Sequence, residues 1–136
     1  MFKIFNDIPE SIYNISEIIN KVDSFDLARE VLLPDFKVPE KFLQKDDFDN
    51  QKGQNLYLRH LTIEGVKNKY GKMSKDLEER VDFELDVIAK TGYPGYFLIV
   101  QDFINAAREM DVSVGPGRGS AAGSVVAYAL GITSID

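Results

Sequence analysis

The part of the sequence best suited to chemistry is a glycine-rich segment, SVGPGRGSAAGS, at residues 113–124, which we term the glycine loop. Glycine has no Cβ atom, so it accepts positive φ angles and lets backbone amides approach a ligand closely. Serine hydroxyls donate hydrogen bonds, and the planar guanidinium of arginine matches the oxygens of a phosphate. The glycine loop therefore predicts a phosphate-binding site, whose candidate residues are Gly117, Arg118, Gly119, Ser120 and Ser124.

Two elements are predicted to position the glycine loop. Val112 to Val114 favour a short strand, and residues 120–130, which are mostly small, favour a helix that ends at Gly131. The first amides of a helix that begins near Ser120 have no partner inside that helix and point back into the loop. Together with the helix dipole, such amides attract an anion. We therefore expect a strand, a phosphate-binding loop and a helix in succession.

The spacing of the glycines differs from that of two common phosphate-binding motifs. The lysine-containing P-loop, G-x-x-x-x-G-K-[ST], is absent from the sequence. The dinucleotide fingerprint fits only in degenerate form, as Gly117, Gly119 and Ala122, and it requires alternating strands and helices upstream. A flexible turn that is rich in glycine and holds no ligand is an alternative that the spacing alone leaves open.

The residues upstream of the glycine loop show helical patterns. Isoleucines repeat at three- and four-residue steps in residues 6–22, which predicts an amphipathic helix. Further helices are expected at 54–70, from Ser74 to a cap at Gly92, and from Pro94 to 110. The run YFLIV inside the last of these is also compatible with a strand. We expect an α+β fold that is mostly helical.

Composition limits the class of protein. The 136 residues are about the length of one domain, and the net charge of −6 argues against a free-standing nucleic-acid-binding protein. In residues 112–136 the only charged side chains are Arg118 and Asp136, so Arg118 is expected to be the only cation near the glycine loop. There is no cysteine and one histidine, which excludes a thiolate or histidine-rich metal site. No membrane-spanning segment or signal peptide is recognisable, so we expect a cytoplasmic setting without a membrane partner.

Two pairs of acidic residues have the spacing of metal ligands, but neither is predicted to be functional. Asp47 and Asp49 lie in a polar stretch that is typical of a solvated turn. Asp82 and Glu84 lie two residues apart on a predicted helix, which directs them to different faces. We therefore expect Asp82 and Glu84 to belong to a surface helix and not to a metal site.

Two segments, GYPGYFLIVQDFI and VGPGRGSAAGSVVAYALGIT, closely resemble the C-family replicative polymerases, the catalytic alpha subunits of bacterial DNA polymerase III. The resemblance is most specific from Gly92 to Asp136 and is looser but collinear upstream. It implies that residues 1–31 are the helical end of a polymerase-and-histidinol-phosphatase (PHP) domain. It further implies a linker at 32–53 and, at 54–136, the first part of a palm with the nucleotidyltransferase fold of the polymerase beta type.

The same resemblance implies a function for the glycine loop. In a DNA-directed DNA polymerase of this family, Gly117, Arg118, Gly119, Ser120 and Ser124 would hold the triphosphate of the incoming dNTP. The family's Mg²⁺-binding aspartates belong to a downstream segment, so we expect no metal ligand and no polymerase activity in these residues alone. The implied partners of the full enzyme are primer–template DNA, dNTP and other replicase subunits.

Two further expectations concern the chain by itself. A truncated palm would leave sheet edges unpaired, which favours self-association. The alternative to a polymerase segment is a small, non-catalytic module that binds an anion or a nucleotide through the glycine loop.

Overall fold

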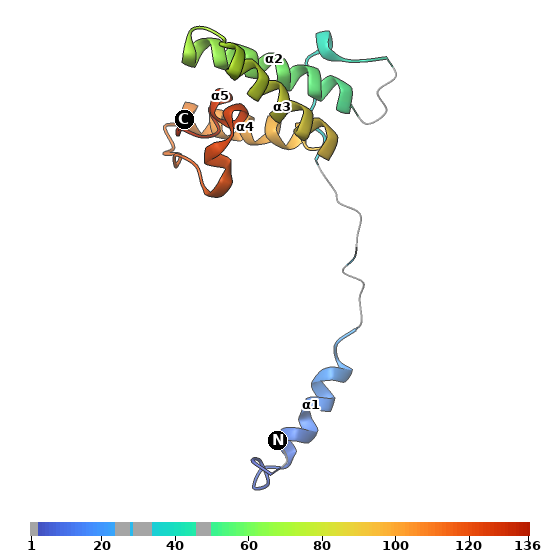
Figure 1. Ribbon diagram of the computed structural model, residues 1–136. Coiled ribbons are helices and arrows are strands. Elements are labelled where there is room, and N and C mark those ends of the chain that lie inside the picture. Colours follow the sequence, from blue (N-terminus) through green and yellow to red (C-terminus); the bar gives the residue numbers. More distant parts are fainter. Residues whose placement is uncertain (1–2, 24–27, 29–33, 46–49) are drawn as a thin grey trace. The chain divides into compact units, whose positions relative to one another are not determined.

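The computed structural model describes residues 3–23, 28, 34–45 and 50–136 (Figure 1). It divides into two units, Met1–Leu32 and Leu33–Asp136. The turn predicted at Asp47 and Asp49 lies outside the described residues, as does part of the predicted linker at 32–53.

In its described residues the first unit contains one helix, α1, at Glu10–Asn20 (Figure 1). The amphipathic pattern of the sequence therefore predicted its secondary structure correctly. None of its residues is buried, and most of its apolar side chains, among them Ile15, Ile18 and Ile19, are exposed.

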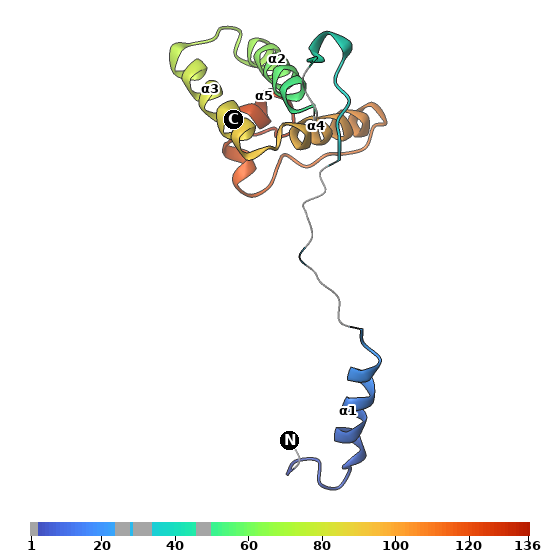
Figure 2. The same cartoon turned by 90° about the vertical axis from the view of Figure 1, so that its right-hand side faces the viewer.

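The second unit is built from helices (Figures 1 and 2). In chain order these are η1 (Glu40–Phe42), α2 (Gln51–Tyr70), α3 (Lys75–Thr91), α4 (Pro94–Glu109), η2 (Gly119–Gly123) and α5 (Val125–Ala129). The predicted ends of α3 and α4 are confirmed. The hydroxyl of Ser74 accepts a hydrogen bond from the Leu77 amide at 3.2 Å, Gly92 ends α3 with φ 77°, and Pro94 lies in the first turn of α4.

The core of this unit lies between α2, α3, α4 and α5. Its most deeply buried apolar side chains are Leu58, Val66, Val81, Leu98 and Val126. The short α5 packs against both α2 and α3 (Figure 2).

The contact between α2 and α5 depends on a glycine. A Cβ atom added at Gly65 would lie only 2.1 Å from the carbonyl oxygen of Ala129, so only glycine permits this approach. The close packing of α5 on α2 fixes the chain directly after the glycine loop.

The expected α+β fold is wrong, because the described residues contain helices and no strand. Val112 to Val114 form no strand, and the Val112 amide donates to the carbonyl of Ala107 at the end of α4. The run YFLIV is helical and belongs to α4. Without a strand in the described part of the chain, the expectation of self-association through unpaired sheet edges loses its basis.

The helix predicted at 120–130 is also wrong in its extent. It is divided into η2 and α5, because Ser124 has extended backbone and its side chain starts a new helix at Val125. Within the ranges described above, no helix is long and apolar enough to cross a membrane.

Candidate functional site

The glycine loop joins the end of α4 to α5 and has two glycines in conformations that favour glycine. Gly117 has φ 132° and Gly119 has φ 56°. A Cβ atom added at Gly117 would also lie 3.0 Å from the Cγ2 atom of Thr133. The predicted positive φ angles are therefore present at two of the candidate positions.

The beginning of the glycine loop is held by the C-terminal segment. The amide of Ser134 donates a hydrogen bond to the carbonyl oxygen of Pro116 at 2.8 Å. Pro116 and Gly117 therefore lie directly against Thr133 and Ser134.

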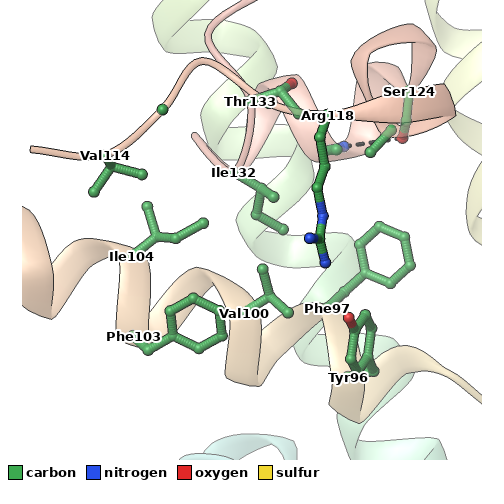
Figure 3. A pocket seen from close by; sticks show the side chains of 14 residues that line it. Tyr96, Phe97, Val100, Phe103, Ile104, Val114, Arg118, Ser124, Ile132 and Thr133 are labelled. Carbon is green, nitrogen blue, oxygen red and sulfur yellow. Dashed lines mark hydrogen bonds between the residues drawn. The ribbon is translucent and has the colours of Figure 1, made fainter.

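Arg118 and Ser120 are exposed and lie on the middle of the loop. Neither side chain makes a hydrogen bond or an ion pair with any residue of the described part of the chain. Arg118 extends across a cavity of about 600 Å³ toward Phe97 and Tyr96 of α4 (Figure 3). Its guanidinium is thus available to a ligand.

The wall of this cavity is mainly apolar and aromatic, and it is formed by α4, the glycine loop and the C-terminal segment. One polar atom in it is unusual. Thr133 is only 1% exposed, and its Oγ1 atom has no hydrogen-bond partner among the residues described. A buried hydroxyl without a partner costs free energy, so Thr133 lowers the stability of this part of the fold.

Ser124 differs from Arg118 and Ser120, because its hydroxyl is already engaged. It donates to Oε2 of Glu84 at 2.8 Å and accepts from the amide of Ala127 at 3.1 Å. Ser124 is thus the N-cap of α5. Ser124 lies at the edge of the cavity, but its hydroxyl already donates a hydrogen bond to Glu84 of α3.

Glu84 of α3 uses both carboxylate oxygens at the start of α5. Oε2 accepts from Ser124 and, at 3.1 Å, from the amide of Val126, while Oε1 accepts from the amide of Val125 at 3.3 Å and from Nε of Arg80 at 2.6 Å. The Glu84 side chain is only 12% exposed. Burial raises the pKa of this carboxyl, but the hydrogen bonds from Arg80 and from the start of α5 outweigh burial and hold the pKa below its ordinary value.

Arg80 of α3 binds both Glu84 and the end of the glycine loop. Its Nε atom is bound to Glu84, and its second terminal nitrogen donates to the carbonyl oxygen of Gly123 at 3.1 Å. One prediction is therefore corrected, because Arg118 is not the only cation at the glycine loop. The helix α3 has an exposed face, as expected, but Glu84 lies on its inward face.

The predicted anion site at a helix start near Ser120 is also corrected. The helix begins at Val125 instead and has only five residues. Its first amides, those of Val125 and Val126, are bonded to Glu84. A carboxylate of the chain itself therefore occupies the start of α5, and these two amides are not available to a phosphate. The side-chain groups that stay available are the Arg118 guanidinium and the Ser120 hydroxyl.

Sequence reasoning missed the role of Arg80 and Glu84 for a physical reason. Their i,i+4 spacing is the only local signal, and it is shared by the pairs Lys75–Glu79 and Asp86–Lys90 on the same helix. Such pairs are common on exposed helix faces. Only the fold shows which of them faces the glycine loop.

The structure offers no metal site in its described part. No group of three or more His, Cys, Asp or Glu side chains in residues 3–23, 28, 34–45 and 50–136 is arranged to hold a metal ion. The residues present do not fit a catalytic Mg²⁺, and we assign no chemical step to one.

Comparison with known proteins gives consistent similarities. The sequence profile described as "Bacterial DNA polymerase III alpha NTPase domain" matches residues 56–136, which include the glycine loop. The "DNA polymerase III subunit alpha" of Borreliella burgdorferi is 45% identical over 137 residues, which cover 100% of this chain. The proteins of the same description from Treponema pallidum and Aquifex aeolicus are 41% and 43% identical, over 100% and 97% of this chain. The chain spans 11% of the length of each of these relatives.

Proposed function

The chain belongs to the family of the bacterial DNA polymerase III alpha subunit, and from this premise we propose that it is a segment of a replicative DNA-directed DNA polymerase. The observation that carries the proposal is that the family profile covers residues 56–136 and includes a glycine loop whose arginine has no partner in the described structure. In this proposal residues 1–31 end a PHP domain, 32–53 form a linker and 54–136 begin the palm.

In the proposed function the glycine loop binds the triphosphate of the incoming dNTP. Arg118 provides a charged, planar donor that pairs with two phosphate oxygens at once. The Ser120 hydroxyl adds a second donor. Gly117 and Gly119, with φ 132° and 56°, turn the backbone so that amides of the loop can approach the phosphates. Neutralising the triphosphate and fixing its orientation bring its α-phosphate to a primer hydroxyl in a defined geometry.

We place Ser124 in a different role from the other candidates. Its hydroxyl donates to Glu84 and its oxygen caps α5, so it holds the end of the glycine loop rather than a phosphate. The nucleotide-binding set of the proposal is therefore Gly117, Arg118, Gly119 and Ser120.

The rest of the active site is assigned to the longer polymerase. The full enzyme would require Mg²⁺, with ligands that are not among the residues described here. Its substrates would be dNTP and primer–template DNA, and its partners would be other subunits of a replicase. The residues of this chain would act by nucleotide binding and orientation.

The test is primer extension by the full-length polypeptide that contains these residues, with the dNTP concentration varied. Arg118→Ala should raise the KM for dNTP about tenfold or more, because a charge-assisted contact to phosphate is lost. Arg59→Ala is the matched control, since Arg59 is a partly exposed arginine that pairs with Asp82 at 2.6 Å and does not line the cavity. A wild-type protein that incorporates no dNTP would exclude the polymerase and leave a non-catalytic anion-binding module.

A further inference from the structure

The end of the glycine loop is attached to α3 by four hydrogen bonds. Glu84 accepts three of them, from the Ser124 hydroxyl and from the amides of Val125 and Val126. Arg80 donates the fourth, to the carbonyl oxygen of Gly123. Arg80 and Glu84 also bind each other, at 2.6 Å between Nε and Oε1, so the four bonds come from a single paired unit.

The beginning of the loop is attached separately. Pro116 accepts a hydrogen bond from the Ser134 amide, and Gly117 lies so close to Thr133 that no Cβ atom fits without movement. The span from Arg118 to Ala122 therefore lies between two fixed ends. Its side chains make no hydrogen bond to the rest of the described structure, so the two attachments determine where the span lies.

We propose that Arg80 and Glu84 are positioning residues for nucleotide binding, which act by fixing the end of the glycine loop. The proposal rests on the proposed function of the loop. Neither residue needs to touch the nucleotide. Glu84 fixes Ser124 and the first turn of α5, Arg80 fixes Gly123, and together they place Arg118 and Ser120 at a constant position relative to the cavity.

The pairing of Arg80 with Glu84 has a second consequence for an anionic ligand. A carboxylate that is bound to the loop would repel a triphosphate if its charge were uncompensated. Arg80 neutralises that charge at 2.6 Å, so the attachment carries no net charge. Replacing Arg80 by a neutral residue removes one hydrogen bond to the loop and also leaves a negative charge beside the site.

The same helix provides a matched control. Asp86 and Lys90 form an i,i+4 ion pair at 2.6 Å, the distance of the Arg80–Glu84 pair, but they lie on the exposed face of α3 and make no hydrogen bond to the glycine loop in the described structure. Changes to Asp86 and Lys90 therefore reproduce the loss of a helix ion pair without the loss of the attachment.

The experiment measures single-dNTP incorporation by the full-length protein with Glu84→Gln, Arg80→Gln, Asp86→Asn and Lys90→Gln. Glutamine keeps the shape of Glu84 but places an NH₂ group, itself a donor, against the donors of Ser124 and Val126. Glu84→Gln should raise the KM for dNTP about tenfold and change kcat much less, because the loop acts in nucleotide binding. Arg80→Gln should raise the KM more than Glu84→Gln, and the excess should shrink at high salt. The two control variants should keep the wild-type KM.

A double-mutant cycle separates positioning from a general loss of structure. If Glu84 acts through the position of Arg118, the effect of Glu84→Gln on the KM should be much smaller in an Arg118→Ala background than in the wild type. Equal effects in both backgrounds would overturn the proposal, as would an unchanged KM in Glu84→Gln. If Glu84→Gln does not fold, Arg80→Lys is the second test. Lysine keeps the positive charge but lacks the second nitrogen that donates to the Gly123 carbonyl. An unchanged KM for dNTP in Arg80→Lys would refute the role of Arg80. A wild-type protein without incorporation would instead refute the proposed function.

Discussion

The carboxylate of Glu84 accepts a hydrogen bond at 2.8 Å from the hydroxyl of Ser124, a residue 40 positions later in the chain. This contact joins α3 to the end of the glycine loop. The serine is also the N-cap of α5. The same carboxylate accepts hydrogen bonds from the amides of Val125 and Val126 in the first turn of that helix. A carboxylate in this position complements the positive end of the helix.

Replacing Glu84 should destabilise the fold. Glu84→Gln leaves a buried glutamine NH₂ group facing the Ser124 hydroxyl and the Val126 amide, both of which donate to the carboxylate of the wild type. Losing hydrogen bonds to a charged group should lower the free energy of unfolding by about 2 kcal/mol. Urea denaturation of the chain measures this value. The control Asp86→Asn, on the exposed face of α3, should change stability by less than about 0.5 kcal/mol.

The stabilisation by Glu84 should depend on pH. Its pKa in the folded protein lies below the ordinary value of a glutamate, because hydrogen bonds from Arg80 and the start of α5 outweigh the effect of burial. A depressed folded pKa gives a stabilisation that is fully present above the unfolded pKa and is lost as the pH falls through the folded value. The difference in unfolding free energy between wild type and Glu84→Gln should therefore be constant near pH 7 and shrink in acid, as the pH falls from the ordinary carboxyl range through the lowered pKa of Glu84. A difference that stays the same in acid would contradict this pKa direction.

The buried hydroxyl of Thr133 should cost stability in the chain by itself. Its Oγ1 atom lacks a hydrogen-bond partner within the described residues, although Thr133 is 1% exposed. Thr133→Val replaces the hydroxyl by a methyl group of similar size and should raise the free energy of unfolding by about 1 kcal/mol. The control is Thr62→Val, because Thr62 is equally buried but donates to the Leu58 carbonyl at 2.8 Å. Thr62→Val should instead lower the free energy of unfolding by about 1 kcal/mol. Thermal or urea unfolding of both variants measures the two changes.

A side chain at Gly65 should disrupt the packing of α5 on α2. The added Cβ atom would lie 2.1 Å from the Ala129 carbonyl oxygen, which is backbone and cannot rotate away. Gly65→Ala should therefore lower the free energy of unfolding by at least about 2 kcal/mol, in spite of the higher helix propensity of alanine. Gly115→Ala serves for comparison, because nothing lies within 4 Å of its added Cβ atom. Equal stability of the two variants would show that α5 can move without cost.

The helices α1 to α4 could be predicted from the sequence, since their signals are local. Ser74 begins α3, Gly92 ends it and Pro94 starts α4, and each of these residues acts through the backbone next to it. The positive φ angles of Gly117 and Gly119 are local in the same sense. The binding of phosphate by Arg118 stays a prediction.

The end of the glycine loop could not be predicted, because its conformation depends on residues far away in the chain. Small residues at 120–130 are compatible with one continuous helix, and the bonds from Glu84 and Arg80 favour a break at Ser124 instead. The expected strand at Val112 fails for a related reason. A strand requires a neighbouring strand to pair with its amides, and here the Val112 amide is used by the end of α4.

The residues of this chain alone should bind a nucleotide only weakly. Arg118 is the available charged donor in the loop, because Arg80 is paired with Glu84 and the first amides of α5 are bonded to the same carboxylate. We expect a Kd for a deoxynucleoside triphosphate no lower than millimolar, which corresponds to about −4 kcal/mol. Calorimetric titration of wild type and Arg118→Ala measures it, and the variant should show no binding. Micromolar binding by the wild type would mean that the glycine loop holds a nucleotide without the remainder of a polymerase active site.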